Sequence, residues 1–159
     1  MKRPIAGFHV DEEGHWVARL SCCHKQHVRH QPPFVLRPWT QSLEGREAML
    51  GHRLECPLCD AREFPDGMQV YKKTAEFTER SMPTGLSGQH ATRPGIWGVI
   101  TVVQGTLRYL IEPPYTCEQL VRAGQTAIVV PEMRHRIAPE EEVRFYVEYY
   151  RCGGSGMQS

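Results

Sequence analysis

Short runs of alternating apolar and polar residues, separated by glycine and proline, fill the second half of the chain. In the clearest run, Val143–Tyr150, the apolar positions are Phe145, Val147 and Tyr149. A period of two is typical of a strand with one buried face. Further strands are predicted over residues 70–74, 76–78, 96–104, 106–111 and 126–130. Many short strands between glycine and proline turns predict an antiparallel sandwich or barrel, so the chain is expected to be mainly β.

The first 60 residues contain fewer predicted elements. Pro4–Val10 and His15–Leu20 are predicted to form a hairpin, because the turn between them contains Gly14, which can adopt a positive φ. Three prolines within residues 31–39 favour an extended surface segment. One helix is predicted over Ser42–Leu50, with Ser42 as its N-cap and a glycine after its last turn. Such a small α+β lobe cannot bury a large core.

Two short clusters of sulfur and imidazole side chains lie in this first half. We predict that one zinc ion is bound tetrahedrally, as a structural site, by Cys22, His24, Cys56 and Cys59. The bound ion would supply stability that the small core lacks. A redox Cys-x-x-Cys motif is less favoured, because no strand–helix–strand unit surrounds it. Buried thiols with solvated histidines are the simpler alternative.

Three neighbouring side chains leave the ligand set partly open. Cys23 is an alternative to Cys22, and His27 is an alternative to His24, since each lies within one short turn of the predicted ligand. His30 lies further along the chain and is better placed to support the site or to face solvent.

Composition narrows the class of protein. The chain has 159 residues, a net charge of +1 and 40% hydrophobic residues. The small net charge argues against a dedicated nucleic-acid or membrane binder. No apolar run is long enough to span a bilayer and no secretory signal precedes the first strand, so we expect a cytoplasmic protein. In that compartment six cysteines indicate metal ligands better than disulfides. Self-association as a homo-oligomer is left open.

The first half resembles a small bacterial domain of unknown function. The resemblance covers about residues 4–60 and is carried by Ile5–His9, Asp11, Trp16–Ala18, Gln26–His30, Pro32, Pro33, Arg37–Trp39 and the Cys-x-x-Cys of residues 56–59. That family implies no activity. It usually has glycine between the Cys and the His, and Cys23 stands at that position here.

The second half resembles the cupin-like domain of tellurite-resistance (TehB-type) and YeaR-like proteins. The residues that carry the resemblance are Val70–Thr74, Pro83, Gly85, His90, Thr92, Pro94–Gly98, Gly105–Tyr109, Gly124, Pro131, His135 and Phe145–Tyr150. It implies a double-stranded β-helix barrel with a pocket at one mouth. Longer TehB-type proteins continue into a methyltransferase, but methyl transfer is not implied for a chain of this length without a glycine-rich motif.

These considerations predict four segments and a second candidate site. The segments are a zinc-binding domain over residues 1–62, a linker over 63–68, a cupin-like barrel over 69–151 and a flexible tail over 152–159.

Metal-binding cupins offer histidines and a carboxylate. His90, His135 and Glu148 are therefore candidate ligands for a second divalent metal in the barrel. The simpler alternative is that the histidines only form hydrogen bonds at the rim.

The favoured function is a non-catalytic, metal-binding stress-response protein that binds or senses a small molecule or a toxic oxyanion such as tellurite. The main alternative is a metal-dependent oxygenase or isomerase that uses His90, His135 and Glu148. It is disfavoured because the barrel lacks the second His of a His-x-His motif and its usual Glu. A third possibility is a protein-interaction adaptor whose His-rich arm is the contact surface.

Overall fold

The chain divides into two compact units. The computed structural model describes residues 1–154, and it separates the unit Met1–Asp66 from a second unit that begins at Gly67. Each unit is described by itself. Over these residues no helix has the length and apolar character needed to cross a bilayer.

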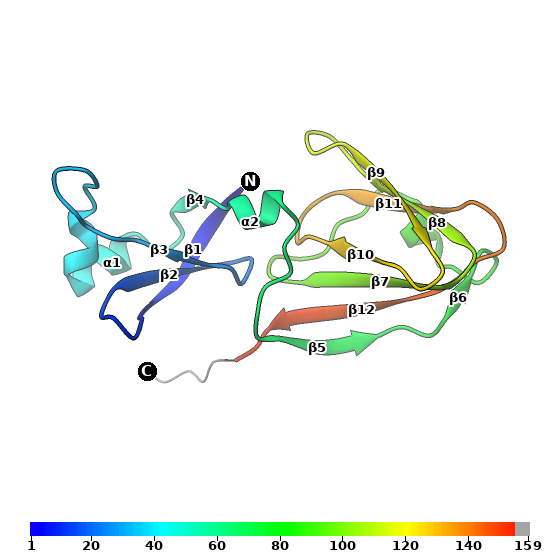
Figure 1. Ribbon diagram of the computed structural model, residues 1–159, viewed down its shortest axis with the longest axis horizontal. Coiled ribbons are helices and arrows are strands. Elements are labelled where there is room, and N and C mark those ends of the chain that lie inside the picture. Colours follow the sequence, from blue (N-terminus) through cyan, green and yellow to red (C-terminus); the bar gives the residue numbers. More distant parts are fainter. Residues whose placement is uncertain (155–159) are drawn as a thin grey trace. The chain divides into compact units, whose positions relative to one another are not determined.

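A four-stranded antiparallel sheet forms the centre of the first unit (Figure 1). Its strand order is β3-β2-β1-β4, and the predicted hairpin is confirmed as its β1–β2 pair. Two short strands that the sequence did not predict, β3 and β4, extend the hairpin on either side. The elements of this unit are β1 (Lys2–Val10), β2 (Trp16–Leu20), β3 (Lys25–His27), η1 (Pro38–Gln41), α1 (Leu43–Ala48), β4 (Arg53–Glu55) and α2 (Pro57–Asp60).

The predicted helix is present but shorter than expected. It runs over Leu43–Ala48, and the Ser42 hydroxyl accepts a hydrogen bond from the Gly45 amide at 3.0 Å, which confirms Ser42 as the N-cap. The proline-rich segment before it is not simply extended. Gln31 and Val35 pair across a tight turn, and η1 begins at Pro38.

Few large apolar side chains are buried in the first unit. Its buried hydrophobic residues include Leu20 and Val28 as the large, fully buried ones, together with Ile5, Val17 and Ala18. Cys22, Cys56 and Cys59 are buried beside them. The sulfur atoms therefore make up a substantial part of this small interior.

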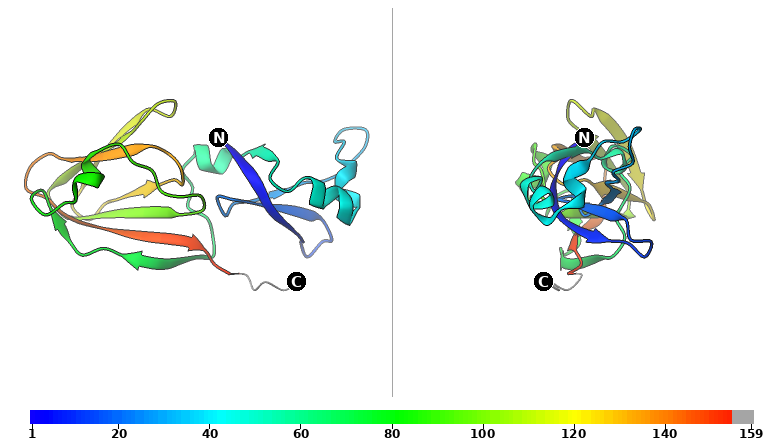
Figure 2. Two further views of the ribbon diagram at one scale, coloured as in Figure 1. Left: turned by 180° about the vertical axis from the view of Figure 1, so that it is seen from behind. Right: turned by 90° about the vertical axis from the view of Figure 1, so that its left-hand side faces the viewer.

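The second unit is a two-sheet β structure. One sheet has the order β10-β7-β12-β5, with β6 also pairing with β12, and the other has the order β11-β8-β9. Figures 1 and 2 show β12 between β7 and β5 from both sides. Its elements are β5 (Met68–Lys73), β6 (Phe77–Thr78), α3 (Thr84–Ser87), β7 (Trp97–Gln104), β8 (Thr106–Ile111), β9 (Cys117–Arg122), β10 (Thr126–Val129), β11 (His135–Pro139) and β12 (Arg144–Cys152).

The alternation of apolar and polar residues in the sequence matches the alternation of buried and more exposed side chains along the strands of this unit. Phe145 and Val147 of β12 are buried, as are Leu107, Tyr109 and Ile111 of β8, while their neighbours along each strand are more exposed. The predicted strands are confirmed, and β9 and β11 complete the second sheet. The result is the predicted double-stranded β-helix, in which side chains from the two sheets fill the interior.

The carboxy-terminal segment is described only in part. Cys152 closes β12, and the Gly153 amide donates to the Gly67 carbonyl at 3.1 Å. The remainder of the predicted flexible tail over 152–159 lies outside the described residues from 155 onward.

Two glycines with similar backbone angles allow a test of how closely the β7–β8 turn packs against the backbone of Glu142. Gly105, in the β7–β8 turn, has a φ of 78°, and Gly124 has a φ of 83°. A Cβ at Gly105 would overlap the Glu142 carbonyl, whereas none of the surrounding atoms lies within 4 Å of a Cβ at Gly124. Gly124→Ala should cost roughly 1–2 kcal/mol of unfolding free energy. Gly105→Ala should cost about 1–3 kcal/mol more, because the backbone must shift. Urea unfolding of both variants measures the difference, and equal costs would contradict the role of this contact.

Candidate metal centre

The turn between β2 and β3 presents two of the predicted ligands. The Leu20 amide donates to the His24 carbonyl and the Cys23 amide donates to the Leu20 carbonyl, both at 2.9 Å, so residues 20–24 form a tight loop. Cys23 has a φ of 74°, which is uncommon for a residue with a side chain. A family that places glycine here avoids this strain. The turn directs Cys22 and His24 to the same side.

The other two ligands come from the start of α2. Cys56 is the residue before this helix, and Pro57 occupies its first position, where a missing amide proton costs nothing. The Cys59 amide donates to the Cys56 carbonyl at 3.1 Å, and the Cys56 amide donates to the Met1 carbonyl at 2.8 Å. This short helical turn brings both sulfurs to one point.

The four side chains converge on one point. Their ligand atoms all lie within 4.8 Å of one another, and all four residues are buried. The Nδ1 atom of His24 is 3.5, 3.4 and 3.5 Å from the sulfurs of Cys22, Cys56 and Cys59. The sulfurs of Cys22 and Cys56 are 3.8 Å apart. A tetrahedral zinc ion with ordinary bond lengths places sulfurs about 3.8 Å apart and nitrogen about 3.6 Å from sulfur. The donor set can hold such an ion without rearrangement.

The second ring nitrogen of His24 is also engaged. His24 Nε2 lies 2.8 Å from the Glu63 carbonyl oxygen, to which it donates a hydrogen bond. That contact fixes the ring and leaves Nδ1 directed at the sulfurs, the arrangement expected of a metal-ligating histidine. The hydrogen bond to Glu63 could not be predicted from the sequence, because every residue has a backbone carbonyl and none is marked by its side chain.

The electrostatics of the cluster favour charge separation when no ion is bound. Burial alone would lower the pKa of His24, but hydrogen bonds to Cys56 and Cys59 outweigh burial and raise that pKa to about 10. The mutual hydrogen bond of Cys22 and Cys56 raises the pKa of the Cys22 thiol and lowers that of the Cys56 thiol. These shifts favour a thiolate on Cys56 beside a protonated His24, and a bound cation would replace those shared protons.

The neighbouring side chains that might have replaced these ligands lie elsewhere. His27 Nε2 is 2.9 Å from an Asp11 carboxylate oxygen, and His30 Nδ1 accepts a hydrogen bond from the Arg37 amide at 2.9 Å. The sulfur in the cluster is that of Cys22, not that of Cys23. The geometry thus selects Cys22 and His24 from the alternatives that the spacing left open.

The two barrel histidines lie side by side. His90 and His135 exchange backbone hydrogen bonds of 2.9 Å in both directions, and their ring centroids are 4.2 Å apart. Each Nδ1 lies 2.9 Å from a backbone carbonyl, that of Gly88 for His90 and that of Met133 for His135. The Nε2 atoms are therefore the unprotonated ones in the neutral rings.

Glu148 does not join these histidines, which corrects the expected ligand set. The small cavity beside the two rings is lined by Val147 and Tyr149 of β12 but not by Glu148. Side chains alternate along a strand, so Glu148 faces the opposite side from those two neighbours. Within residues 1–154, the Cys22 cluster is the one group of at least three Cys, His, Asp or Glu side chains close enough to share an ion.

The barrel interior leaves little room beside the histidines. The cavity measures about 10 Å³, and about 10–15 Å³ is the least that holds one water molecule. Ile100, Val129 and Ile137 form part of its wall. His135 is only 2% exposed, and burial lowers its pKa to about 4. His135 is therefore best described as a neutral, hydrogen-bonded member of the core, and the half-buried His90 lies beside it.

Comparisons with known families match each half separately. Residues 6–63 match a family described as a protein of unknown function (DUF3565), and residues 72–147 match the TehB-like domain. Over 99 residues the chain is 26% identical to the uncharacterized protein YeaR of Escherichia coli strain K12. The matched region covers 55% of this chain and 82% of YeaR. The resemblances predicted from the sequence are confirmed for both halves.

Two crystal structures share the fold of the second half. A protein from E. coli strain K12 is 23% identical with a TM-score of 0.52, covering 57% of this chain and 96% of that protein. TehB from Haemophilus influenzae is 21% identical with a TM-score of 0.51, covering 55% of this chain and 32% of TehB. Since this chain spans only about a third of TehB, the likeness concerns the fold and not the activity of the whole protein.

The buried His135 predicts an acid-sensitive barrel. Its pKa of about 4 in the folded protein lies below the value of about 6.5 in an unfolded chain. Between these values the unfolded chain binds a proton that the folded barrel does not, so stability falls as the pH is lowered from 6.5 to 4. The loss should approach roughly 3 kcal/mol.

Urea unfolding followed at the Trp97 indole signal, at pH 7 and pH 4.5, measures this loss. His135→Gln should have a smaller difference between the two pH values than the unchanged protein. His52→Gln is the control, because His52 is exposed. A pH dependence that is the same in the unchanged protein and in His135→Gln would show that another group causes it.

Proposed function

We propose that this chain, which matches DUF3565 in its first half and the TehB-like domain in its second, is a metal-binding protein related to tellurite resistance. In this proposal a structural zinc ion holds the first unit together. The observation that carries the proposal is the convergence of Cys22, His24, Cys56 and Cys59 on one point, with the distances of a tetrahedral site. The TehB-like and YeaR matches supply the link to the resistance proteins.

Zinc is favoured by the chemistry of the donors. Three thiols and one imidazole are soft or borderline ligands, which exclude magnesium and calcium and suit zinc in tetrahedral geometry. Four protein ligands leave no open position for water or substrate. The ion therefore stabilises the fold and takes no part in hydrolysis.

The second unit is proposed to bind or sense a small molecule or a toxic oxyanion as part of a stress response. This part rests on the TehB-like resemblance of residues 72–147. The alternative of a metal-dependent oxygenase or isomerase has lost a proposed ligand, because Glu148 is not in the wall of the cavity beside His90 and His135. A divalent metal in the barrel is accordingly not part of this proposal.

Removal of one sulfur tests the structural role of the ion. Cys59→Ser should lose the bound zinc and most amide-exchange protection in residues 1–60, while the barrel keeps its protection, because the first unit has little other core. Cys117→Ser is the matched control, since Cys117 is a free cysteine in β9 outside the cluster. Bound metal is measured by elemental analysis of protein purified without a histidine tag.

Two results would contradict the proposal. Stoichiometric zinc in Cys59→Ser with undiminished protection would show that the cluster does not clamp the unit. Absence of zinc from the unchanged protein, even after it is supplied in excess, would show that the cluster serves another purpose.

A further inference from the structure

A second cavity lies in the first unit, away from the metal ligands. It measures about 250 Å³ and is open to solvent. At roughly 30 Å³ per water molecule it would hold about eight waters, so it can take a small organic molecule. It is lined by Gly14, His15, Trp16, Val28, Arg29, His30, Gln31, Thr40 and Gln41.

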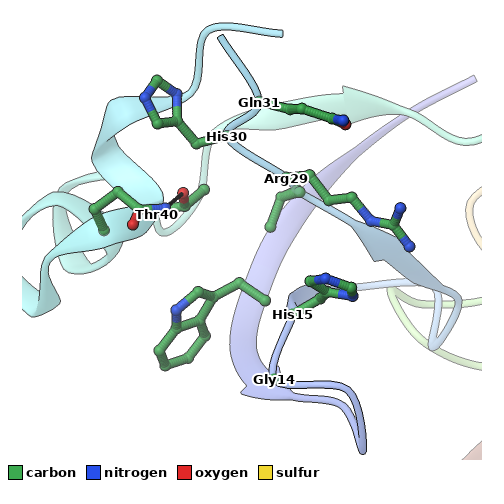
Figure 3. A pocket seen from close by; sticks show the side chains of 9 residues that line it. Gly14, His15, Arg29, His30, Gln31 and Thr40 are labelled. Carbon is green, nitrogen blue, oxygen red and sulfur yellow. Dashed lines mark hydrogen bonds between the residues drawn. The ribbon is translucent and has the colours of Figure 1, made fainter.

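The cavity is built by three segments that meet around it. Gly14 and His15 come from the β1–β2 turn, Arg29 to Gln31 follow β3, and Thr40 faces them from η1 (Figure 3). Its floor is apolar at Val28, which is fully buried, and the indole of Trp16 forms another wall. The remaining walls are mostly polar. Two apolar walls beside polar ones suit a small molecule that has both an apolar body and a charged or polar group.

The walls are held in place by a series of side-chain contacts. The guanidinium of Arg46 lies 3.6 Å from the centre of the Trp16 ring and donates to the Thr40 carbonyl at 2.7 Å. The Thr40 hydroxyl donates to the Arg37 carbonyl at 2.9 Å, and the Arg37 amide donates to His30 Nδ1 at 2.9 Å. The cavity is therefore preorganised, which lowers the entropy cost of ordering it around a ligand.

The charges around the cavity favour an anion. Because His30 Nδ1 accepts a hydrogen bond, its ring proton is on Nε2, which is a donor. The guanidinium of Arg29 has no hydrogen-bond or ion-pair partner in the part of the chain that the structure covers. The nearby acids are already occupied: Asp11 contacts His27 and the amide of His15, and Glu13 lies 3.4 Å from the His15 ring.

We propose that this cavity binds a small organic carboxylate with a flat apolar body. The carboxylate would pair with Arg29, a side chain whose fork matches two carboxylate oxygens. The body would lie against Trp16 and Val28. An inorganic oxyanion would leave both apolar walls unused in a space of this size. The site goes beyond the proposed function and does not depend on which ion the cluster holds.

Benzoate is the probe, and the full-length protein is titrated with it by NMR. The expected result is a saturable shift of the Trp16 indole signal. Arg29→Gln should weaken binding about tenfold or more, because a charged hydrogen bond is lost. Arg29 is exposed, so this variant is expected to fold. Arg122→Gln, an exposed position on β9, is the matched control and should bind like the unchanged protein.

Two further ligands separate the parts of the proposal. Benzyl alcohol has the same flat body without the charge and should bind at least several-fold more weakly. Inorganic phosphate carries charge without the body and should also be weaker. The proposal is overturned if benzoate leaves the Trp16 signal unmoved, if Arg29→Gln binds it equally well, or if either comparison ligand binds as tightly as benzoate.

Discussion

The mutual proximity of three thiols and one imidazole is the constraint on which the first unit depends. Cys22 and Cys56 are 34 positions apart, yet their sulfurs lie 3.8 Å from each other. Holding them there fixes the β2–β3 turn against the start of α2. Buried polar groups are costly unless each finds a partner. Here the cysteines and His24 satisfy one another, and the Glu63 carbonyl satisfies the outer ring nitrogen. A cation at the centre would displace the shared protons, and its bonds to the four side chains would crosslink the two segments.

The second unit is stabilised in a different way. Its interior contains Trp97, Tyr109 and Phe145, all fully buried, and apolar strands from two sheets cover them. The buried polar residue there, His135, uses the Met133 carbonyl for its Nδ1 proton and so fits into the core without a charge. These large buried side chains give the barrel a hydrophobic core of its own. The two units are therefore expected to respond to different perturbations, the first to loss of a side chain of its Cys/His cluster and the second to acid or to disturbed packing.

Most of this fold, and one of its sites, follow from patterns in the sequence. The alternation of apolar and polar residues predicted the long strands, and the cysteine spacing predicted which side chains form the buried cluster, because both patterns depend on local geometry. The assignment of Glu148 was wrong although the same alternation could have corrected it. If Phe145, Val147 and Tyr149 face inward, Glu148 must face outward. The strands β9 and β11 were not predicted, since their burial alternates imperfectly and their pairing with β8 is a tertiary property.

The cavity proposed to bind a carboxylate could not be predicted, because its walls come from three separate segments held together by side-chain contacts.

The β2–β3 hairpin connects the two sites of the first unit. Its turn carries Cys22 and His24, while its open end carries Trp16 and Val28, which line the cavity. The two strands stay in register through the pairs Val17–His27 and Arg19–Lys25. A ligand that binds only the folded hairpin stabilises it, whichever end it occupies. The proposed binding of a metal at one end and of a carboxylate at the other would therefore be linked, and each would strengthen the other by the same factor if the free unit is partly unfolded. A contact between the two ligands is not required, because the shared hairpin is enough to couple them.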